Sequence, residues 1–314
     1  MRFVSFSTEA LPAAHLGIVR DSEVVDVDLA GRALQLSVPD QMQELIDNYA
    51  EYRPRLQAIL DKAEGRRFTE VKTFSSIGAA HALESVQLAA PIPHPRKNIL
   101  CMALNYSEHV KETSIIRSRS AEPPTIPVIF TKAPTTINGP YGKFEIDPAV
   151  STEIDWEVEL AVIIGRKGKN IRAEEAMSYI FGYTVLNDIT ARDLQAKHKQ
   201  FFKGKSLDGS CPMGPWIVTA DEIPHPDNLA LHLRVNGVDK QNSNTSQMVF
   251  SIPTMIATMS LGMTLEPGDI IATGTPSGVG YSRTPAEFLR PGDIMESEIE
   301  NIGIMRNPIV KVGH

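Results

Sequence analysis

Cysteine is scarce in this sequence: Cys101 and Cys211 are its two cysteines among 314 residues. They exclude the disulfide framework of a small secreted domain, and their spacing does not match a zinc site. Long apolar runs are missing too, because no stretch approaches the roughly 18 residues of a membrane-spanning helix. The first residues also lack the apolar core of a signal peptide. We therefore expect a cytoplasmic protein that does not bind a membrane.

Basic segments are missing as well. The net charge is −7, and no basic block interleaved with aromatic residues offsets it, which argues against nucleic acid as a partner. Segment 204–206 resembles the end of a phosphate-binding loop, but Lys199 stands where that motif requires a glycine. The glycines of segment 274–280 do not have the dinucleotide-binding spacing either. We therefore reject a nucleotide-binding function.

The remaining composition is that of a soluble globular protein, with 42% hydrophobic and 22% charged residues. Residues 1–70 predict a small N-terminal α+β domain, in which a helix over 39–63 is broken or kinked at Pro54. This domain has no convergent polar cluster, so we assign it to packing or oligomerisation. A proline-rich linker follows over 71–96. Residues 97–314 predict a strand-rich α+β domain without the regular strand–helix alternation of a doubly wound sheet.

An acidic stretch stands out within the large domain. Asp155, Glu157 and Glu159 alternate with apolar residues, so the period of a strand places their carboxylates on one face. The same face becomes apolar at Ala161 and Ile163, which puts the acids at the end of a buried strand. Like charges there need a positive partner, and carboxylate oxygens are what a hard divalent cation prefers. The alternative is a strand with a solvated acidic face.

A second candidate is the pair His109 and Glu112. If Ser107 begins a helix, these two residues share one helical face, where a carboxylate orients an imidazole and raises its basicity. That is the arrangement of a general base. The alternative is an exposed helical turn with an incidental pair. The polar, proline-ended segment 113–126 follows, and such a loop beside a site is typical of a lid.

Two later stretches place polar groups at the ends of predicted strands. Asp188 follows a buried strand over 182–186 and precedes a helix over 190–199, so it is either a ligand or the cap of that helix. Segment 266–280 predicts a strand that runs into a glycine-rich loop. The backbone and hydroxyl groups of that loop are suited to approaching a small anionic ligand.

The large domain contains a series of motifs. In chain order they are Asn105-Tyr106-x-x-His109-x-x-Glu112, Glu157-x-Glu159, Asp188-Ile-Thr-Ala-Arg192, Lys205-Ser206, Cys-Pro-Met-Gly-Pro215, Asn-Thr-Ser-Gln-Met248 and Thr-Gly-Thr275-Pro-Ser-Gly278. In this order they resemble the fumarylacetoacetate hydrolase family, from about residue 97 to the C-terminus. The small N-terminal domain is similar to that of the two-domain bacterial members. The combination favours a functional interpretation of each motif over the alternatives given above.

The resemblance implies a mixed β-sandwich roll around a divalent metal, usually Mg²⁺ or Mn²⁺, with Ca²⁺ as a further candidate. The residues at the metal-ligand positions are Glu157, Glu159 and Asp188. The base dyad and the lysine that stabilises negative charge correspond to His109, Glu112 and Lys205. The positions that contact substrate are occupied by Tyr106, Arg192, Gln195 and Thr275. We expect burial either to depress the pKa of Lys205 or to fix its hydrogen bonding.

One segment departs from the family pattern. The stretch between Glu112 and Phe130 is longer than in the short members, and it carries Arg117 and Arg119. We therefore predict a substrate with a second, distal carboxylate that these arginines bind. A solvated loop with two surface arginines is the alternative.

The implied substrate is a small 2-oxo acid, and the implied reaction is hydrolysis of a C–C bond in a 2,4-diketo acid such as an acylpyruvate or fumarylpyruvate. Isomerisation or tautomerisation of an unsaturated 2-oxo diacid or of oxaloacetate is an alternative, as is decarboxylation of a 2-keto acid, because the same enolate serves all of them. A binding protein on a degenerate site would lack a ligand or a base, and neither is missing here. We expect a homodimer.

Overall fold

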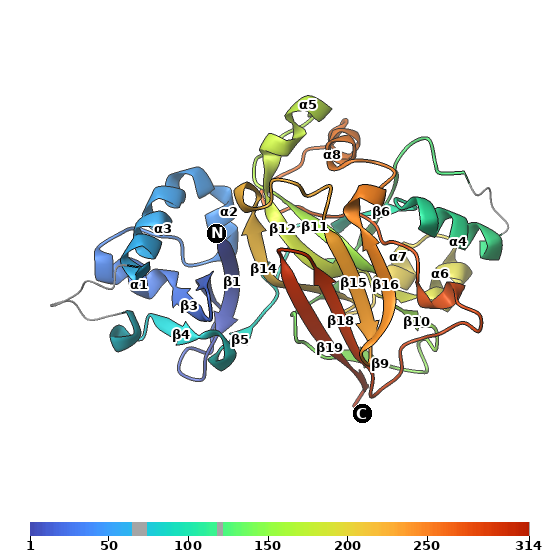
Figure 1. Ribbon diagram of the computed structural model, residues 1–314, viewed down its shortest axis with the longest axis horizontal. Coiled ribbons are helices and arrows are strands. Elements are labelled where there is room, and N and C mark those ends of the chain that lie inside the picture. Colours follow the sequence, from blue (N-terminus) through green and yellow to red (C-terminus); the bar gives the residue numbers. More distant parts are fainter. Residues whose placement is uncertain (65–73, 118–121, 314) are drawn as a thin grey trace.

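The computed structural model of this chain describes residues 1–64, 74–117 and 122–313. It confirms a strand-rich α+β fold with mixed β-sheets. Figure 1 shows the N-terminal region, in blue, at one end of the molecule and the large domain at the other. No helix within these three ranges combines the length and the apolar composition needed to cross a membrane.

In its described residues, the N-terminal region contains short strands and three α-helices. Its strands are β1 (Arg2–Ser7), β2 (His15–Arg20), β3 (Glu23–Asp26), β4 (Ala80–Ala82) and β5 (Gln87–Leu88). Its helices are α1 (Val27–Leu34), α2 (Met42–Asp47) and α3 (Tyr49–Glu64). Strands β4 and β5 lie inside the predicted linker, and they pair with β3 and β1.

The large domain holds the other elements. Its strands are β6 (Ile99–Ala103), β7 (Val128–Lys132), β8 (Ile137–Asn138), β9 (Phe144–Ile146), β10 (Ile154–Asp155), β11 (Val158–Ile164), β12 (Ile180–Asn187), β13 (Thr190–Ala191), β14 (Cys211–Thr219), β15 (Ala230–Val235), β16 (Val238–Asn244), β17 (Ile270–Ala272), β18 (Ile294–Ile299) and β19 (Gly303–Lys311). Its helices are α4 (Ser107–Arg117), α5 (Ala173–Ala176), α6 (Arg192–His198), α7 (Phe202–Lys205) and α8 (Ile252–Ser260).

The main sheet extends across both regions. Its strands follow the order β4-β3-β2-β1-β14-β12-β11-β17-β6-β7, so the N-terminal strands continue the sheet of the large domain through the β1–β14 pair. A second sheet has the order β16-β15-β18-β19-β9. Both sheets are mixed, because β6 pairs in parallel with β17 and β9 pairs in parallel with β19.

Strand β11 is buried along its whole length because both of its faces are covered. Leu160 and Val162 belong to the core shared with the second sheet, which includes Met295. Ala161 and Ile163 belong to a core that continues into the N-terminal helices. A strand covered on both faces is a rigid support for the residues at its ends.

The helical prediction for residues 39–63 was wrong at its break point. The chain interrupts the helix at Asn48, between α2 and α3, and Pro54 lies inside α3. Pro54 is the sixth residue of α3, so its missing N–H removes one hydrogen bond, to the Ala50 carbonyl, and the helix continues past it. The predicted helix over 190–199 corresponds to α6.

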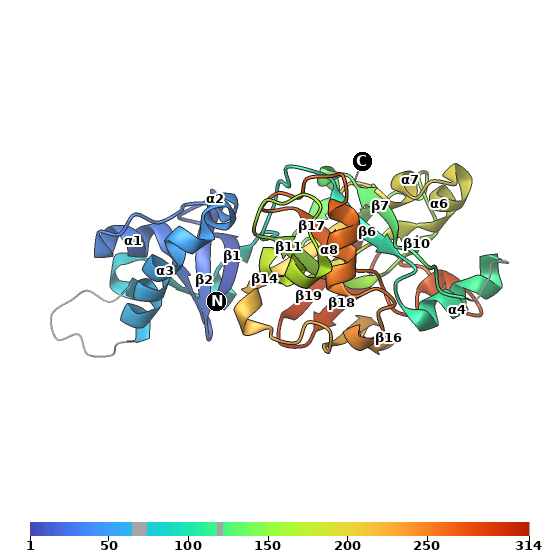
Figure 2. The same ribbon diagram turned by 90° about the horizontal axis from the view of Figure 1, so that it is seen from above.

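The helices α4, α6 and α7 gather at the end of the large domain that lies away from the N-terminal region, as the two perpendicular views show (Figures 1 and 2). These three helices carry several of the residues singled out by the sequence. The candidate site therefore lies far from the small N-terminal region.

Candidate metal and acid–base site

Three carboxylates converge where β11 begins and β12 ends. Glu157 lies just before β11, Glu159 within it and Asp188 just after β12. The antiparallel register of the two strands, with Val158 opposite Asn187, brings these positions together. One oxygen of each carboxylate lies within 4.8 Å of the other two, and all three side chains are buried. The acidic strand therefore does not present a solvated face.

Asp155 does not join this cluster, contrary to the expected alternation. The strand is interrupted between β10 and β11, so the period of two does not continue through Trp156. Asp155 instead accepts hydrogen bonds from Arg192 Nε at 2.8 Å and from the Gly280 N–H at 2.6 Å. It anchors the glycine-rich loop and the arginine.

Three buried cations surround the carboxylates. Lys205 Nζ donates to Glu157 Oε2 and to Asp188 Oδ2, both at 2.7 Å. Arg192 Nη2 donates to Glu157 Oε1 at 2.6 Å. Lys132 Nζ lies 2.8 Å from the second oxygen of Asp188, Oδ1. Each oxygen of Asp188 is therefore paired with one lysine. Asp188 does not cap α6, because the N-cap residue of that helix is Ala191.

The carboxylates differ in how far neighbouring cations offset their negative charge. Burial raises the pKa of Glu159 well above its usual value, and the negative charges of Asp188 and Glu157 raise it further. Burial alone would raise the pKa of Glu157 as well, but Lys205 and Arg192 outweigh it and hold that pKa below its usual value. Of these two carboxylates, Glu159 is thus the one whose negative charge is less compensated.

The donor set fits a hard divalent cation. With Asp155 included, four buried carboxylates stand against three buried cations, so the formal charge of the cluster is negative. A divalent cation would reverse this sign, and an all-oxygen donor set is what Mg²⁺ and Mn²⁺ prefer. The residues that would hold it are Glu157, Glu159 and Asp188.

Lys205 has fixed hydrogen bonds rather than a depressed pKa. Burial lowers the pKa of its ammonium group, but the charges of Asp188 and Glu157 outweigh burial and raise the pKa above its usual value. Lys205 is therefore a permanent positive charge at the wall of the site. Its ammonium nitrogen also lies 5.2 Å from the centre of the Phe130 ring.

The predicted dyad forms on the first turns of α4. His109 Nδ1 lies 3.2 Å from Glu112 Oε2. Burial by itself raises the pKa of Glu112, but hydrogen bonds from His109, from the Ser282 hydroxyl and from the Gly278 N–H (3.0 Å) outweigh it and lower that pKa. With Glu112 ionised, Nδ1 of His109 is the nitrogen that donates, so Nε2 is the basic one.

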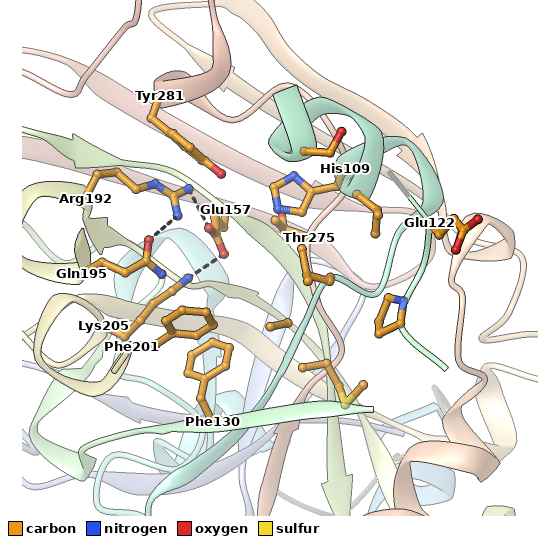
Figure 3. Close-up of a pocket in the computed structure, with 16 residues that line it drawn as sticks. His109, Glu122, Phe130, Glu157, Arg192, Gln195, Phe201, Lys205, Thr275 and Tyr281 are labelled. Carbon is orange, nitrogen blue, oxygen red and sulfur yellow. Dashed lines mark hydrogen bonds and ion pairs between the residues drawn. The ribbon is translucent and has the colours of Figure 1, made fainter. Parts of the chain in front are cut away.

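The dyad and the carboxylates face each other across a cavity of about 250 Å³. Figure 3 shows His109 on one side, with Glu157, Arg192 and Lys205 on the other. Phe130 and other apolar residues form much of the remaining wall. The cavity therefore combines an imidazole, two cations and two carboxylates, Glu157 and Glu122, with an apolar lining.

The structure brings most of the predicted site residues to this cavity. Those that line it are His109, Glu157, Arg192, Gln195, Lys205 and Thr275. Glu112 supports His109 from behind, and the buried Glu159 and Asp188 complete the carboxylate cluster beneath the wall. The side chain of Arg117 and the whole of Arg119 lie outside the described residues, so the distal-carboxylate hypothesis stays a prediction.

Tyr106 and Arg192 differ from the substrate contacts that the family pattern implies. Tyr106 is fully buried and is not part of the cavity lining, and its hydroxyl has no hydrogen-bond partner in the described ranges. Arg192 lines the cavity, but its guanidinium is already bound to Asp155 and Glu157. Its hydrogen bonds support the position of Glu157, and its guanidinium also lies 4.2 Å from the centre of the Tyr281 ring.

The glycine-rich loop is hydrogen-bonded to Glu159 and to the start of β11. The Gly274 N–H donates to Glu159 Oε2 at 2.7 Å. The Thr275 hydroxyl donates to the Val158 carbonyl at 3.0 Å and accepts from Gln241 Nε2 at 2.8 Å. The loop therefore holds β11 through both backbone and side-chain hydrogen bonds.

Sequence reasoning missed two residues that support the site. Lys132 holds Asp188, and the Ser282 hydroxyl donates to Glu112. A lysine in the otherwise mainly apolar strand β7 was a signal for the first. The second had no local signal, because Ser282 and Glu112 are 170 positions apart in the chain.

Comparisons with known proteins agree with this geometry. A family profile described as fumarylacetoacetate (FAA) hydrolase C-terminal matches residues 98–310. The chain is also 43% identical, over 295 residues, to the oxaloacetate tautomerase YisK of Bacillus subtilis, covering 93% of this chain and 94% of that relative. The chain belongs to the fumarylacetoacetate hydrolase family.

Solved structures of related enzymes have the same fold over the whole chain. A fumarylacetoacetate hydrolase from Exiguobacterium antarcticum has a TM-score of 0.79 and 35% identity, covering 99% of this chain and 100% of that one. A maleylpyruvate hydrolase from Sphingobium, solved with manganese(II) and pyruvate, has a TM-score of 0.76 and 30% identity, with full coverage of both chains. Hydrolases and tautomerases thus share this fold.

Proposed function

We propose that this protein is a metal-dependent keto–enol tautomerase of a small 2-oxo dicarboxylic acid, with oxaloacetate as the first substrate to test. The observation that carries the proposal is the 43% identity to an oxaloacetate tautomerase over nearly the full length of both chains. This similarity favours the tautomerase alternative over the hydrolysis that the motifs had put first. Mg²⁺ or Mn²⁺ is the proposed cation.

The charge of the site supports a dianionic substrate. The buried cluster is formally negative by itself and becomes positive once Glu157, Glu159 and Asp188 hold a divalent cation. Part of this positive charge is the ammonium group of Lys205, which lies at the cavity wall. A site of this sign attracts a dicarboxylate more strongly than a neutral molecule of the same size.

Keto–enol tautomerisation needs few functional groups in the site. The bound cation would supply a Lewis acid that stabilises negative charge on the substrate. His109 Nε2, oriented by Glu112, removes a proton from the carbon next to the keto group. Negative charge develops on the keto oxygen, where the ammonium of Lys205 offsets it. The proton taken up by His109 is then delivered to that oxygen, directly or through solvent, which completes the enol and restores the neutral imidazole. The same steps in reverse return the keto form with every carbon retained.

Hydrolysis of an acylpyruvate is the second candidate. It is favoured by the likeness to the maleylpyruvate hydrolase, which was solved with pyruvate. Hydrolysis requires, in addition to the groups above, a water molecule placed to attack a carbonyl carbon. Tautomerisation requires only the proton transfer and the stabilisation of charge.

The test starts from enol oxaloacetate and follows the loss of its ultraviolet absorbance. Metal-stripped, Mg²⁺-loaded and His109→Ala protein are each compared with buffer at the same free Mg²⁺, because the free ion is itself a Lewis acid. We expect acceleration by the loaded wild type alone. Proton NMR of the same samples should show keto oxaloacetate and no excess pyruvate. If oxaloacetate is converted no faster than in buffer while an acylpyruvate is split into pyruvate and a free acid, the protein is a hydrolase.

A further inference from the structure

Lys132 is a lysine with no exposed surface, at the end of β7. Its ammonium nitrogen lies 2.8 Å from Asp188 Oδ1, 3.2 Å from the Ile189 carbonyl and 3.3 Å from the Ser210 hydroxyl, and it also donates to the Lys205 carbonyl. A buried ammonium group is costly unless its hydrogens are all bonded. The hydrogen bonds of Lys132 go to the Ile189 and Lys205 carbonyls and to the Ser210 hydroxyl. Its contact with Asp188 Oδ1 is an ion pair, and that oxygen has no hydrogen-bond partner within the described residues.

The position of Lys132 follows from the alternation of β7. Phe130 and Lys132 are two residues apart, so they lie on the same face of the strand. Phe130 reaches the cavity on this face, where Figure 3 shows it near Lys205. Lys132 reaches the far side of Asp188, away from the cavity lining. A second bond joins the same segments, because the Ala133 N–H donates to the Ser206 hydroxyl at 3.1 Å.

We propose that Lys132 is a positioning residue of the carboxylate centre. Its ion pair with Oδ1 holds the Asp188 carboxylate, whose Oδ2 accepts from Lys205, and its hydrogen bond to the Lys205 carbonyl fixes the backbone that carries Lys205. One buried ammonium group thus sets both a candidate metal-binding carboxylate and the lysine beside it. The proposal concerns the carboxylate centre and does not depend on which reaction takes place there.

Removal of Lys132 changes the affinity for a divalent cation, and the direction of the change depends on the role of this lysine. If Lys132 acted only as a positive charge, its removal would make the site more negative and would tighten the binding of a divalent cation. If it positions Asp188, its removal frees that carboxylate to turn, and cation binding weakens. Outer groups that orient metal ligands are typically worth about tenfold to a hundredfold in metal affinity. The two roles therefore predict changes of opposite sign.

The experiment measures Mn²⁺ affinity by isothermal titration calorimetry on the metal-stripped full chain. Lys132→Met is compared with wild type and with Lys97→Met. Lys97 is a matched control, because its ammonium nitrogen lies 2.8 Å from Asp269 Oδ2 but it is not part of the carboxylate centre. We expect the Kd for Mn²⁺ to rise by about tenfold or more in Lys132→Met and to stay at the wild-type value in Lys97→Met.

An unchanged or lower Kd in folded Lys132→Met overturns the proposal, and so does a wild type that binds no Mn²⁺. If Lys132→Met does not fold, Lys132→Gln and Ser210→Ala replace it, and each should weaken Mn²⁺ binding in the same direction by a smaller factor. Wild-type affinity in both overturns the proposal. Failure of wild type to act on oxaloacetate, with the effect of Lys132 intact, would overturn the proposed function alone.

Discussion

The two regions of this chain bury acidic side chains in different ways. In the described part of the N-terminal region, Asp26 is the buried acid, and its carboxylate accepts from the Leu29 N–H at 2.9 Å and lies 3.0 Å from His15 Nδ1. It caps α1 and so serves the local structure. The large domain instead gathers Glu157, Glu159 and other carboxylates in one place.

The difference shows how a structural acid can be told from a functional one. One oxygen of Asp26 accepts from the Leu29 N–H, and the other lies beside the His15 imidazole without a hydrogen bond in the described residues. Glu159 instead faces like charges that raise its pKa. Like charges gathered in a buried place destabilise the fold unless something binds between them. Loss of a carboxylate should therefore lower the stability of the fold at Asp26, and should leave it unchanged or raise it at Glu159.

The largest effect should follow Glu159→Gln. This change replaces one of the three carboxylates with a neutral amide, a weaker ligand, and removes a buried like charge. We expect metal-dependent turnover to fall to the level of buffer, while the melting temperature of the metal-stripped protein stays the same or rises. Activity assays and thermal unfolding with and without Mg²⁺ would check this. A marked drop in the melting temperature of the stripped protein would mean that Glu159 is a structural acid like Asp26.

His109→Ala should come next, with kcat lowered by roughly 10²-fold or more through loss of the base. His109 does not belong to the carboxylate cluster, so Mn²⁺ affinity should stay at the wild-type value. Steady-state kinetics and calorimetry on the same preparation separate the two quantities. If metal affinity and kcat fell together, His109 would have to contribute to metal binding as well as to proton transfer.

A smaller effect is expected for Ser282→Ala, which removes one hydrogen bond to Glu112. A hydrogen bond to a charged group contributes about 1.5 kcal/mol at the low end, which corresponds to about tenfold in rate. We therefore expect kcat to fall by about tenfold, while Ser282→Thr, which keeps the hydroxyl, retains most of the activity. Equal losses in both variants would point to packing rather than to the hydrogen bond.

The smallest effect on catalysis should come from Asp26→Ala. Loss of the helix cap should lower the free energy of unfolding by about 1–2 kcal/mol, with kcat/KM unchanged. Asp26→Asn keeps a capping oxygen and should lose less stability. Urea denaturation gives the first quantity and substrate kinetics the second. A fall in kcat/KM for Asp26→Ala would show that the N-terminal region supports the site.

The sequence by itself determined the family, the acidic cluster and the pairing of His109 with Glu112. These features rest on short-range geometry, since the strand period sets Glu157 with Glu159 and the helix turn sets His109 with Glu112. The order of the motifs then supplied the long-range grouping with Asp188. The strand-rich α+β class followed from the same local patterns.

Only the tertiary structure decided how these groups are held. The strand break before β11 turned Asp155 away from the carboxylates, and the helix broke at Asn48 while α3 accommodated Pro54. The support from Lys132 and Ser282 arises from segments far apart in the chain. No local period encodes such contacts, because strand pairing and loop packing select them only when the whole fold forms.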